Sequence, residues 1–269
     1  MIHPFVRIKR FVPATVLLLS AAVLLTSAPA RAQEETPPVH GQGLIWLVSP
    51  LVGYNRDELK QPDRTGQIRT ATKTAPEYGL FALVAHPRFV VNDFLFFTEA
   101  ASDTDVMGNF FHANLYGDPD ATVTWNVGAG HLYHKITPQN VDIEVSVPLV
   151  KAGLLLRYKP WGLTFNPYVG YSWERVDTHL QVPPRDQRIH TKNNAPLYGL
   201  TVDWQWRMVG LNVKYYYQDS QESDDSFNNW HVRLTSGITR HWGVAIRFDS
   251  MEHSTTDDTS LLAGPVYVF

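Results

Sequence analysis

Charged side chains recur at alternate positions in the second half of the chain. Their neighbours in the sequence are mostly apolar, so in an extended strand the charged residues would share one face. The set comprises Lys151, Arg157, Glu174, Asp203, Arg207, Lys214, His231, Arg233, Arg247 and Asp249. Lysine and arginine outnumber the carboxylates. Because enclosed charges must be paired or hydrated, this face predicts either a network of ion pairs or a basic, watered passage.

Other site chemistry has little support in the sequence. His131 and His134 form the motif HLYH, but residues three apart on a strand point to opposite faces, so a shared metal ion is not expected. Hydrolysis through a serine would require a histidine within reach. No His-x-Ser motif occurs, so such a pair would have to join two strands, for example Ser250 and a nearby histidine. We assign no catalytic residue, no metal site and no cofactor.

The elements that carry the charges are predicted to be long β-strands. The segment LYGLTVDWQWRM at 197–208 alternates apolar and polar residues, and LNVKYYYQDS at 211–220 repeats the pattern. Only Val209–Gly210 separates them, which predicts a tight hairpin. Further alternating segments lie at 162–174, 229–239 and 242–250. Their lengths approach the ~9–11 residues with which a tilted strand crosses a bilayer.

Short and long connections alternate along the chain. Short ones are predicted at Val90–Asp93, Gly117–Ala121, Pro160–Gly162, Val209–Gly210 and Arg240–His241. Long polar ones are predicted at Asn55–Pro76, Ser102–Val106, Lys135–Val145, Arg175–Pro196, Gln218–Asn228 and Glu252–Thr259. This is the pattern of a meander with tight turns at one rim and loops at the other. The fold class is therefore all-β: a closed antiparallel up-and-down barrel of about 12 strands over residues 43–269.

Aromatic residues cluster at both ends of the predicted strands, as they do at the two interfaces of a membrane. The last strand, GPVYVF, places Tyr267 and Phe269 on one face. A barrel in lipid must be closed, because an open edge would leave backbone groups unpaired in hydrocarbon. The last strand should therefore pair with the first, GLIWLVSPLVGYN at 43–55.

The N-terminal segment 1–32 has the features of a cleaved secretory signal peptide. Basic residues precede an apolar run, and the small residues Ala30 and Ala32 form a small-x-small motif that predicts cleavage after Ala32. A short periplasmic segment at 33–42 is predicted to follow it. The chain contains no cysteine, which excludes a disulfide framework and a lipid-anchored lipoprotein. Its 26 acidic residues exceed its 23 lysines and arginines, so nucleic acid is not an expected partner.

The signal peptide, the alternating strands and the terminal Tyr-x-Phe together resemble the Gram-negative outer-membrane β-barrel proteins, in the manner of a small porin-like barrel. The resemblance covers the whole mature chain. It implies location in the outer membrane, contact with outer-membrane lipid and lipopolysaccharide, and recognition of the C-terminal strand, with Tyr267 and Phe269, by the barrel-assembly machinery.

The charged face favours a narrow porin-like channel for small polar or anionic solutes, because basic residues lining a lumen attract anions. The early strands are apolar on both faces, so one wall of the lumen is predicted to be apolar, which would suit the passage of an amphipathic solute. One alternative is a closed structural or surface-binding barrel without conductance, in which the charges pair across the lumen. A second alternative is an outer-membrane lipid hydrolase.

Overall fold

The computed structural model describes residues 44–62, 68–100, 104–137, 141–182, 185–219, 226–252 and 256–269. The predicted signal peptide at 1–32 and the segment at 33–42 lie outside these ranges. None of the described residues belongs to a helix long and apolar enough to span a membrane.

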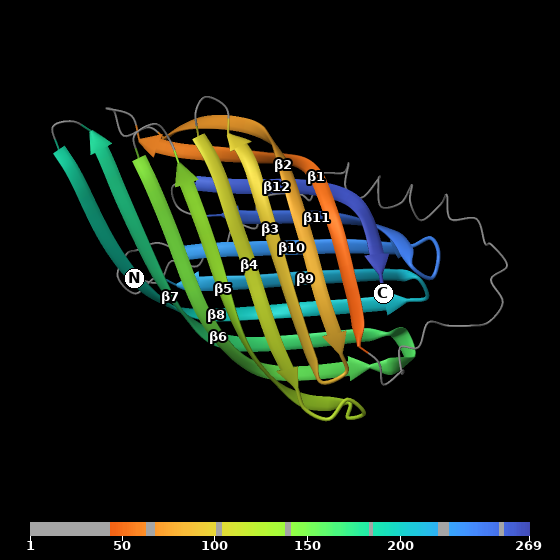
Figure 1. Ribbon diagram of the computed structural model, residues 1–269. Helices are drawn as coiled ribbons and strands as arrows, with labels where there is room; N and C mark the ends of the chain where they lie inside the picture. Colours follow the sequence, from red (N-terminus) through yellow and green to blue (C-terminus); the bar gives the residue numbers. More distant parts are fainter. Residues whose placement is uncertain are drawn as a thin grey trace. The chain divides into compact units, whose positions relative to one another are not determined.

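The described residues form one closed antiparallel barrel, shown in Figure 1, which confirms the predicted fold class. Each strand pairs with its neighbours in sequence, and the last strand pairs with the first. The twelve strands are β1 (Ile45–Pro62), β2 (Ile68–His86), β3 (Phe89–Ala100), β4 (Thr104–Tyr116), β5 (Val123–Thr137), β6 (Val141–Tyr158), β7 (Leu163–Val182), β8 (Arg185–Trp206), β9 (Val209–Asp219), β10 (Ser226–Gly237), β11 (Trp242–Glu252) and β12 (Thr256–Val268).

Alternation along each strand separates an apolar outer surface from the lumen. Val52 is 60% exposed whereas its neighbour Leu51 is 2% exposed, and Val169 is 59% exposed whereas Tyr168 is 6% exposed. Successive strand residues point to opposite faces, so one residue of each pair lies outside the barrel and the other inside. The outer surface therefore carries large apolar side chains, as a lipid-facing surface requires.

The two ends of the barrel differ in the length of strand beyond the apolar surface. At what we call the turn end, short connections join β2–β3, β4–β5, β6–β7, β8–β9 and β10–β11. At the opposite, extended end, most residues predicted to form long loops continue as paired strand. The β7–β8 hairpin reaches furthest there (Figure 1), and its pairing runs out to Val182 and Arg185.

Several turns lie a few residues from their predicted positions. The β2–β3 turn comprises Pro87–Arg88 rather than 90–93, and the β8–β9 turn comprises Arg207–Met208 rather than Val209–Gly210. In both cases the alternating pattern continues through the predicted turn, so periodicity alone did not locate the reversal.

The seam between β1 and β12 closes the barrel. Pairing runs from Leu47 to Leu59 but is interrupted between Val48 and Val52, where Pro50 lacks the N–H that a ladder needs. In the gap, the Ser49 Oγ–H donates a 2.8 Å hydrogen bond to the Pro265 carbonyl oxygen. The ladder is therefore interrupted at Pro50 without a shift of register.

Candidate functional site

The charged set predicted to line the lumen occupies inward-facing positions, with one exception. Lys151 and Arg247 are almost fully buried. Arg157 lies at the turn end, where Nη1 donates to the carbonyl oxygens of Asp118 and Ala121, each at 3.0 Å. The other inward members are Glu174, Asp203, Lys214, His231, Arg233 and Asp249.

Arg207 is the exception. It lies in the β8–β9 turn with a φ of 52°, and its exposed guanidinium lies 4.9 Å from the centre of the Trp206 ring. Two-residue hairpin turns favour positive φ at their central residues, and Arg207 occupies such a position in the turn instead of a strand position that faces the lumen. It is not part of the lumen surface.

Asp249 organises the charges in the middle of the barrel. Arg247 Nε donates to Asp249 Oδ2 at 2.5 Å, and His231 Nδ1 hydrogen-bonds to Asp249 Oδ1. The three side chains come from neighbouring strands, because His231 on β10 stands opposite Asp249 on β11. Their charges are thus compensated by direct hydrogen bonds rather than by solvent.

Two central arginines also lie over aromatic rings. The Arg247 guanidinium lies 3.7 Å from the centre of the Phe94 ring, and the Arg233 guanidinium lies 4.3 Å from that of Phe81. In the closed ring of strands, β10 and β11 are each four strands away from the strand they reach, β2 or β3. These cation–π contacts therefore span the lumen instead of joining adjacent strands.

One further contact connects opposite walls. The Phe110 ring on β4 lies 5.3 Å, centre to centre, from the His231 ring on β10, and β4 and β10 stand diametrically opposite in the strand order. The Tyr216 ring stacks on the other side of this histidine at 5.7 Å. We call this group the central layer, which comprises Phe81, Phe94, Phe110, Tyr216, His231, Arg233, Arg247 and Asp249. Its contacts join opposite walls of the barrel.

Buried polar side chains lie on both sides of the central layer. Toward the turn end, four buried asparagines face inward from β3, β4, β5 and β7: Asn92, Asn114, Asn126 and Asn166. Toward the extended end, Glu77 is 3% exposed, and Asn55 Nδ2 donates to Asp258 Oδ1 at 2.9 Å. Buried carboxamides and carboxylates need hydrogen-bond partners, so both levels of the interior are polar rather than apolar.

The apolar wall predicted on the early strands forms part of the packed interior. Leu51, Leu262 and Val266 are buried in one apolar cluster, and Leu47 and Leu83 pack against it. This cluster is continuous with Phe81 and Phe94 of the central layer. The inward leucines therefore contribute core packing.

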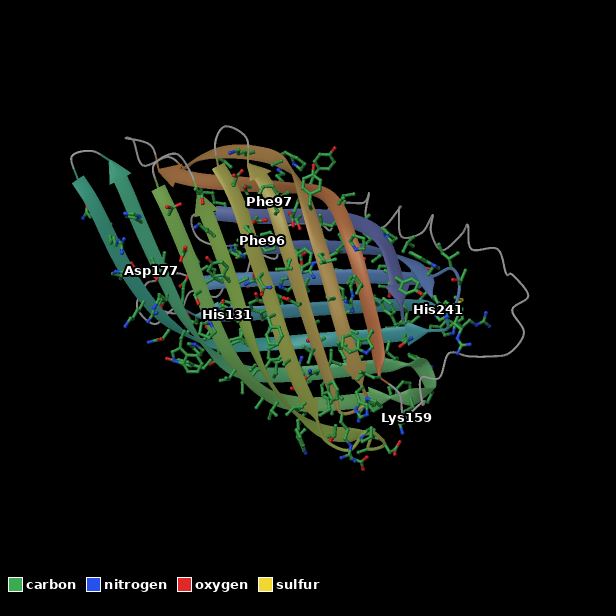
Figure 2. The ribbon with its side chains drawn as sticks, in the orientation of Figure 1. Phe96, Phe97, His131, Lys159, Asp177 and His241 are labelled. Carbon is green, nitrogen blue, oxygen red and sulfur yellow. The ribbon has the colours of Figure 1, made fainter. Side chains whose placement is uncertain are left out.

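A serine and a histidine that the sequence did not bring together meet on the outer surface. His131 Nε2 lies 2.9 Å from Ser146 Oγ, and both residues face outward from the adjacent strands β5 and β6. Figure 2 labels His131 on this part of the barrel. His134, the other histidine of HLYH, faces inward and contacts the Phe96 ring at 5.2 Å, so the predicted separation of the two histidines is confirmed.

Ser250, the serine that the sequence offered as an example, is not part of this pair. Ser250 faces outward between Trp230 and Thr259, its register partners, and has no histidine opposite it. The sequence predicts a long loop at 135–145, directly before Ser146, whereas in the structure β5 and β6 pair out to Ile136 and Ile143. The contact between Ser146 and His131 depends on this register of β5 and β6, which places the two residues diagonally next to each other and which the sequence pattern does not show.

A groove on the outer surface adjoins Ser146. Its volume is ≈ 380 Å³, and its outward-facing lining consists of Ser146, Pro148, Trp173, Arg175, Lys192 and Asn194. Glu174 also borders the groove, but its side chain faces inward and accepts a hydrogen bond from Asn193 Nδ2 at 3.3 Å. Ser146 stands opposite Arg175, and Arg175 stands opposite Lys192, so these three lie in one row across β6, β7 and β8. The groove thus combines a hydroxyl, two cations and an indole ring at the edge of the apolar surface.

The geometry defines an outer-membrane-type β-barrel with a packed lumen and an outward Ser–His pair. No protein-family model matches the chain, and no curated protein matches its sequence. Among solved structures, the chain is similar to the translocator domain of the autotransporter NalP from Neisseria meningitidis, with a TM-score of 0.51 and 10% identity over 94% of this chain and 96% of that one. It is also similar to the transport unit of the autotransporter AIDA-I from Escherichia coli, with a TM-score of 0.52 and 12% identity over 93% of this chain and 98% of that one. These similarities show the fold.

Proposed function

We propose that the protein is an integral outer-membrane barrel of a Gram-negative bacterium whose lumen is closed at the central layer. The apolar outer surface, the fold and the predicted signal peptide support the location. In this orientation the turn end faces the periplasm and the extended end faces outward, as is usual for such barrels. The outer surface contacts outer-membrane lipid and lipopolysaccharide, and the assembly machinery recognises the last strand through Tyr267 and Phe269.

The contact between Phe110 and His231 carries the proposal of closure. Because these rings come from opposite walls and lie 5.3 Å apart, no open path passes between them. The cations of the layer are held by Asp249 and by aromatic rings, so they serve the packed interior. This geometry favours the closed barrel over the narrow anion channel that the charge pattern alone suggested.

A lumen of this kind also differs from what the names of the similar structures imply. A translocator domain and a transport unit are named for transport, and a cargo passing through this lumen would have to displace the central layer. A conducting protein would therefore require rearrangement of Phe110, His231 and their neighbours.

Conductance of the refolded protein in a planar bilayer tests the closed lumen. We expect no steady current from the native chain and a measurable current from the double variant Phe94→Ala and Phe110→Ala. Phe111→Ala is the matched control, because Phe111 follows on the same strand but faces outward. A steady, anion-selective current through the native chain would refute closure and support the porin-like channel.

A further inference from the structure

We propose that His131 and Ser146 form the catalytic pair of an acyl-ester hydrolase acting on phosphate-bearing membrane lipids. This inference uses the membrane location proposed above and is independent of whether the lumen conducts. The distance of 2.9 Å between Nε2 and Oγ is within the range for a serine nucleophile and its general base. Both side chains are partly exposed on the outer face, where a lipid can reach them.

The pair lies at the boundary of the apolar surface. On β6 the outward residues from Pro148 to Leu156 are apolar, and Tyr158 marks the turn end. From Ser146 to Tyr158 the strand is about 40 Å long, or about 28 Å along the membrane normal at a tilt of about 45°. An outer-membrane barrel has an apolar band about 25 Å tall, so Ser146 lies near the depth of the acyl esters in the external leaflet.

The groove beside Ser146 supplies the features needed to hold a lipid headgroup. Arg175 and Lys192 are adjacent, exposed cations, and within the described ranges neither has an ion-pair partner. Like charges opposite each other in a sheet repel, so a bound phosphate would stabilise this arrangement. Trp173, which is 44% exposed, provides an amphipathic ring at the same level.

Two pairs of side chains closer to the extended end are already in contact. Lys135 pairs with Glu144 at 3.5 Å, and His190 pairs with Asp177. Figure 2 labels Asp177 on this extended part of β7, beyond the level of His131. At the level of Ser146, by contrast, Arg175 and Lys192 carry positive charge without an ion-pair partner among the described residues.

The reaction follows from the pair. With the Nδ1–H tautomer, His131 Nε2 accepts the Ser146 hydroxyl proton as Oγ attacks the ester carbonyl carbon. The tetrahedral oxyanion collapses, the bond from the carbonyl carbon to the alcohol oxygen breaks, and His131 protonates the departing alcohol. A water molecule then gives its proton to His131 and attacks the acyl-serine. The Oγ–carbon bond breaks, Oγ regains the proton from His131, and the fatty acid leaves.

The cations extend the site toward the substrate. Arg175 stands directly opposite Ser146, so its guanidinium is placed to stabilise negative charge beside the nucleophile. Lys192 lies one strand further away and is placed to bind the phosphate. We therefore expect loss of Lys192 to weaken lipid binding more than turnover, and loss of Arg175 to lower both.

Two measurements on the refolded full chain test the proposal. The first is labelling by a fluorophosphonate probe, with the modified residue identified by mass spectrometry. The second is release of fatty acid from phosphatidylethanolamine vesicles and, in a separate arm, from purified lipopolysaccharide. We expect labelling at Ser146, release in one of the two arms, and a decrease of at least about 100-fold in both readouts for Ser146→Ala and for His131→Ala.

Ser250→Ala is the matched control, because Ser250 is an outward serine at the same end without a histidine opposite it. It should leave both readouts unchanged. Release by the phospholipid arm identifies a phospholipid substrate, and release by the lipopolysaccharide arm identifies lipid A. A heat-modifiable barrel that is neither labelled at Ser146 nor active on either lipid would overturn the proposal, as would activity that persists in Ser146→Ala. A conducting native barrel would overturn only the closed lumen.

Discussion

Asp249→Asn should be the most destabilising polar substitution in the barrel. Asp249 accepts hydrogen bonds from Arg247 Nε at 2.5 Å and from His231. Hydrogen bonds to a charged group contribute about 1.5–3 kcal/mol each, so the loss of two predicts about 3–6 kcal/mol. The Arg247 side chain is 10% exposed and that of Asp249 is 18% exposed, so solvent screens this pair weakly. Breaking a buried pair from one side costs about 3–5 kcal/mol, and we expect a value of about 3–4 kcal/mol within this range.

The partner substitution separates charge pairing from loss of packing. Arg247→Met alone removes the cation from Asp249, whereas Arg247→Met combined with Asp249→Asn removes both charges. Replacing both members of a buried ion pair is often nearly neutral. The double variant should therefore be at least about 1.5 kcal/mol more stable than the sum of the two single effects predicts.

The assay is urea unfolding in lipid vesicles, with tryptophan fluorescence and electrophoretic heat-modifiability as independent probes of folding. Asp203→Asn serves as the control, because Asp203 is exposed and accepts one hydrogen bond, from Asn212 Nδ2 at 2.5 Å. It should cost less than about 1 kcal/mol. A cost below about 1 kcal/mol for Asp249→Asn, or additive single effects, would refute the assignment of Asp249 as the centre of the layer.

Three further substitutions test the outer surface and the seam. Val202→Arg, on the outer face, should lower the free energy of unfolding in lipid by about 2–4 kcal/mol. Lys192→Arg, beyond the apolar band on the same strand, should lower it by less than about 0.5 kcal/mol. Equal losses in urea unfolding would contradict the assigned membrane level. Phe269→Ser should lower the amount of folded protein in outer-membrane fractions, because it removes the ring that packs edge-to-face on Tyr267 at 4.5 Å and completes the aromatic edge. Unchanged amounts would argue against a role in assembly. Gly264→Val should reduce the heat-modifiable band, because a Cβ at Gly264 would lie 1.9 Å from the Pro50 carbonyl oxygen on the paired strand β1. A band of native intensity would show that the seam can widen.

Alternation predicted which side chains face the lumen because the period of a strand is a local property. Thr201 and Val202 fall on opposite faces as expected, with Thr201 buried. The same local pattern could not locate the turns, since it continues through them. Arg207 was therefore placed on a strand face although it occupies the turn.

Contacts between strands depend on register and on distance across the barrel, which periodicity does not encode. Sequence indicated that His231 and Arg247 share the inner face, but not that aromatic rings from the opposite wall reach them. It also could not show that Ser146 meets His131, because this depends on how far β5 and β6 pair. In both cases the two side chains that meet come from different strands, and the alternation within one strand does not show which residues of another strand they contact.

The seam has a kinetic consequence, because it joins Ser49 to Pro265, 216 positions apart in the chain. Every other strand pair is a hairpin between sequence neighbours. Closing a loop of this length costs about 5 kcal/mol of chain entropy, so the seam should form after the hairpins. Until then β1 and β12 are unpaired edges that can join those of another molecule. Because closure is unimolecular and this competing association is bimolecular, the yield of closed barrel should fall as the concentration of refolding protein rises.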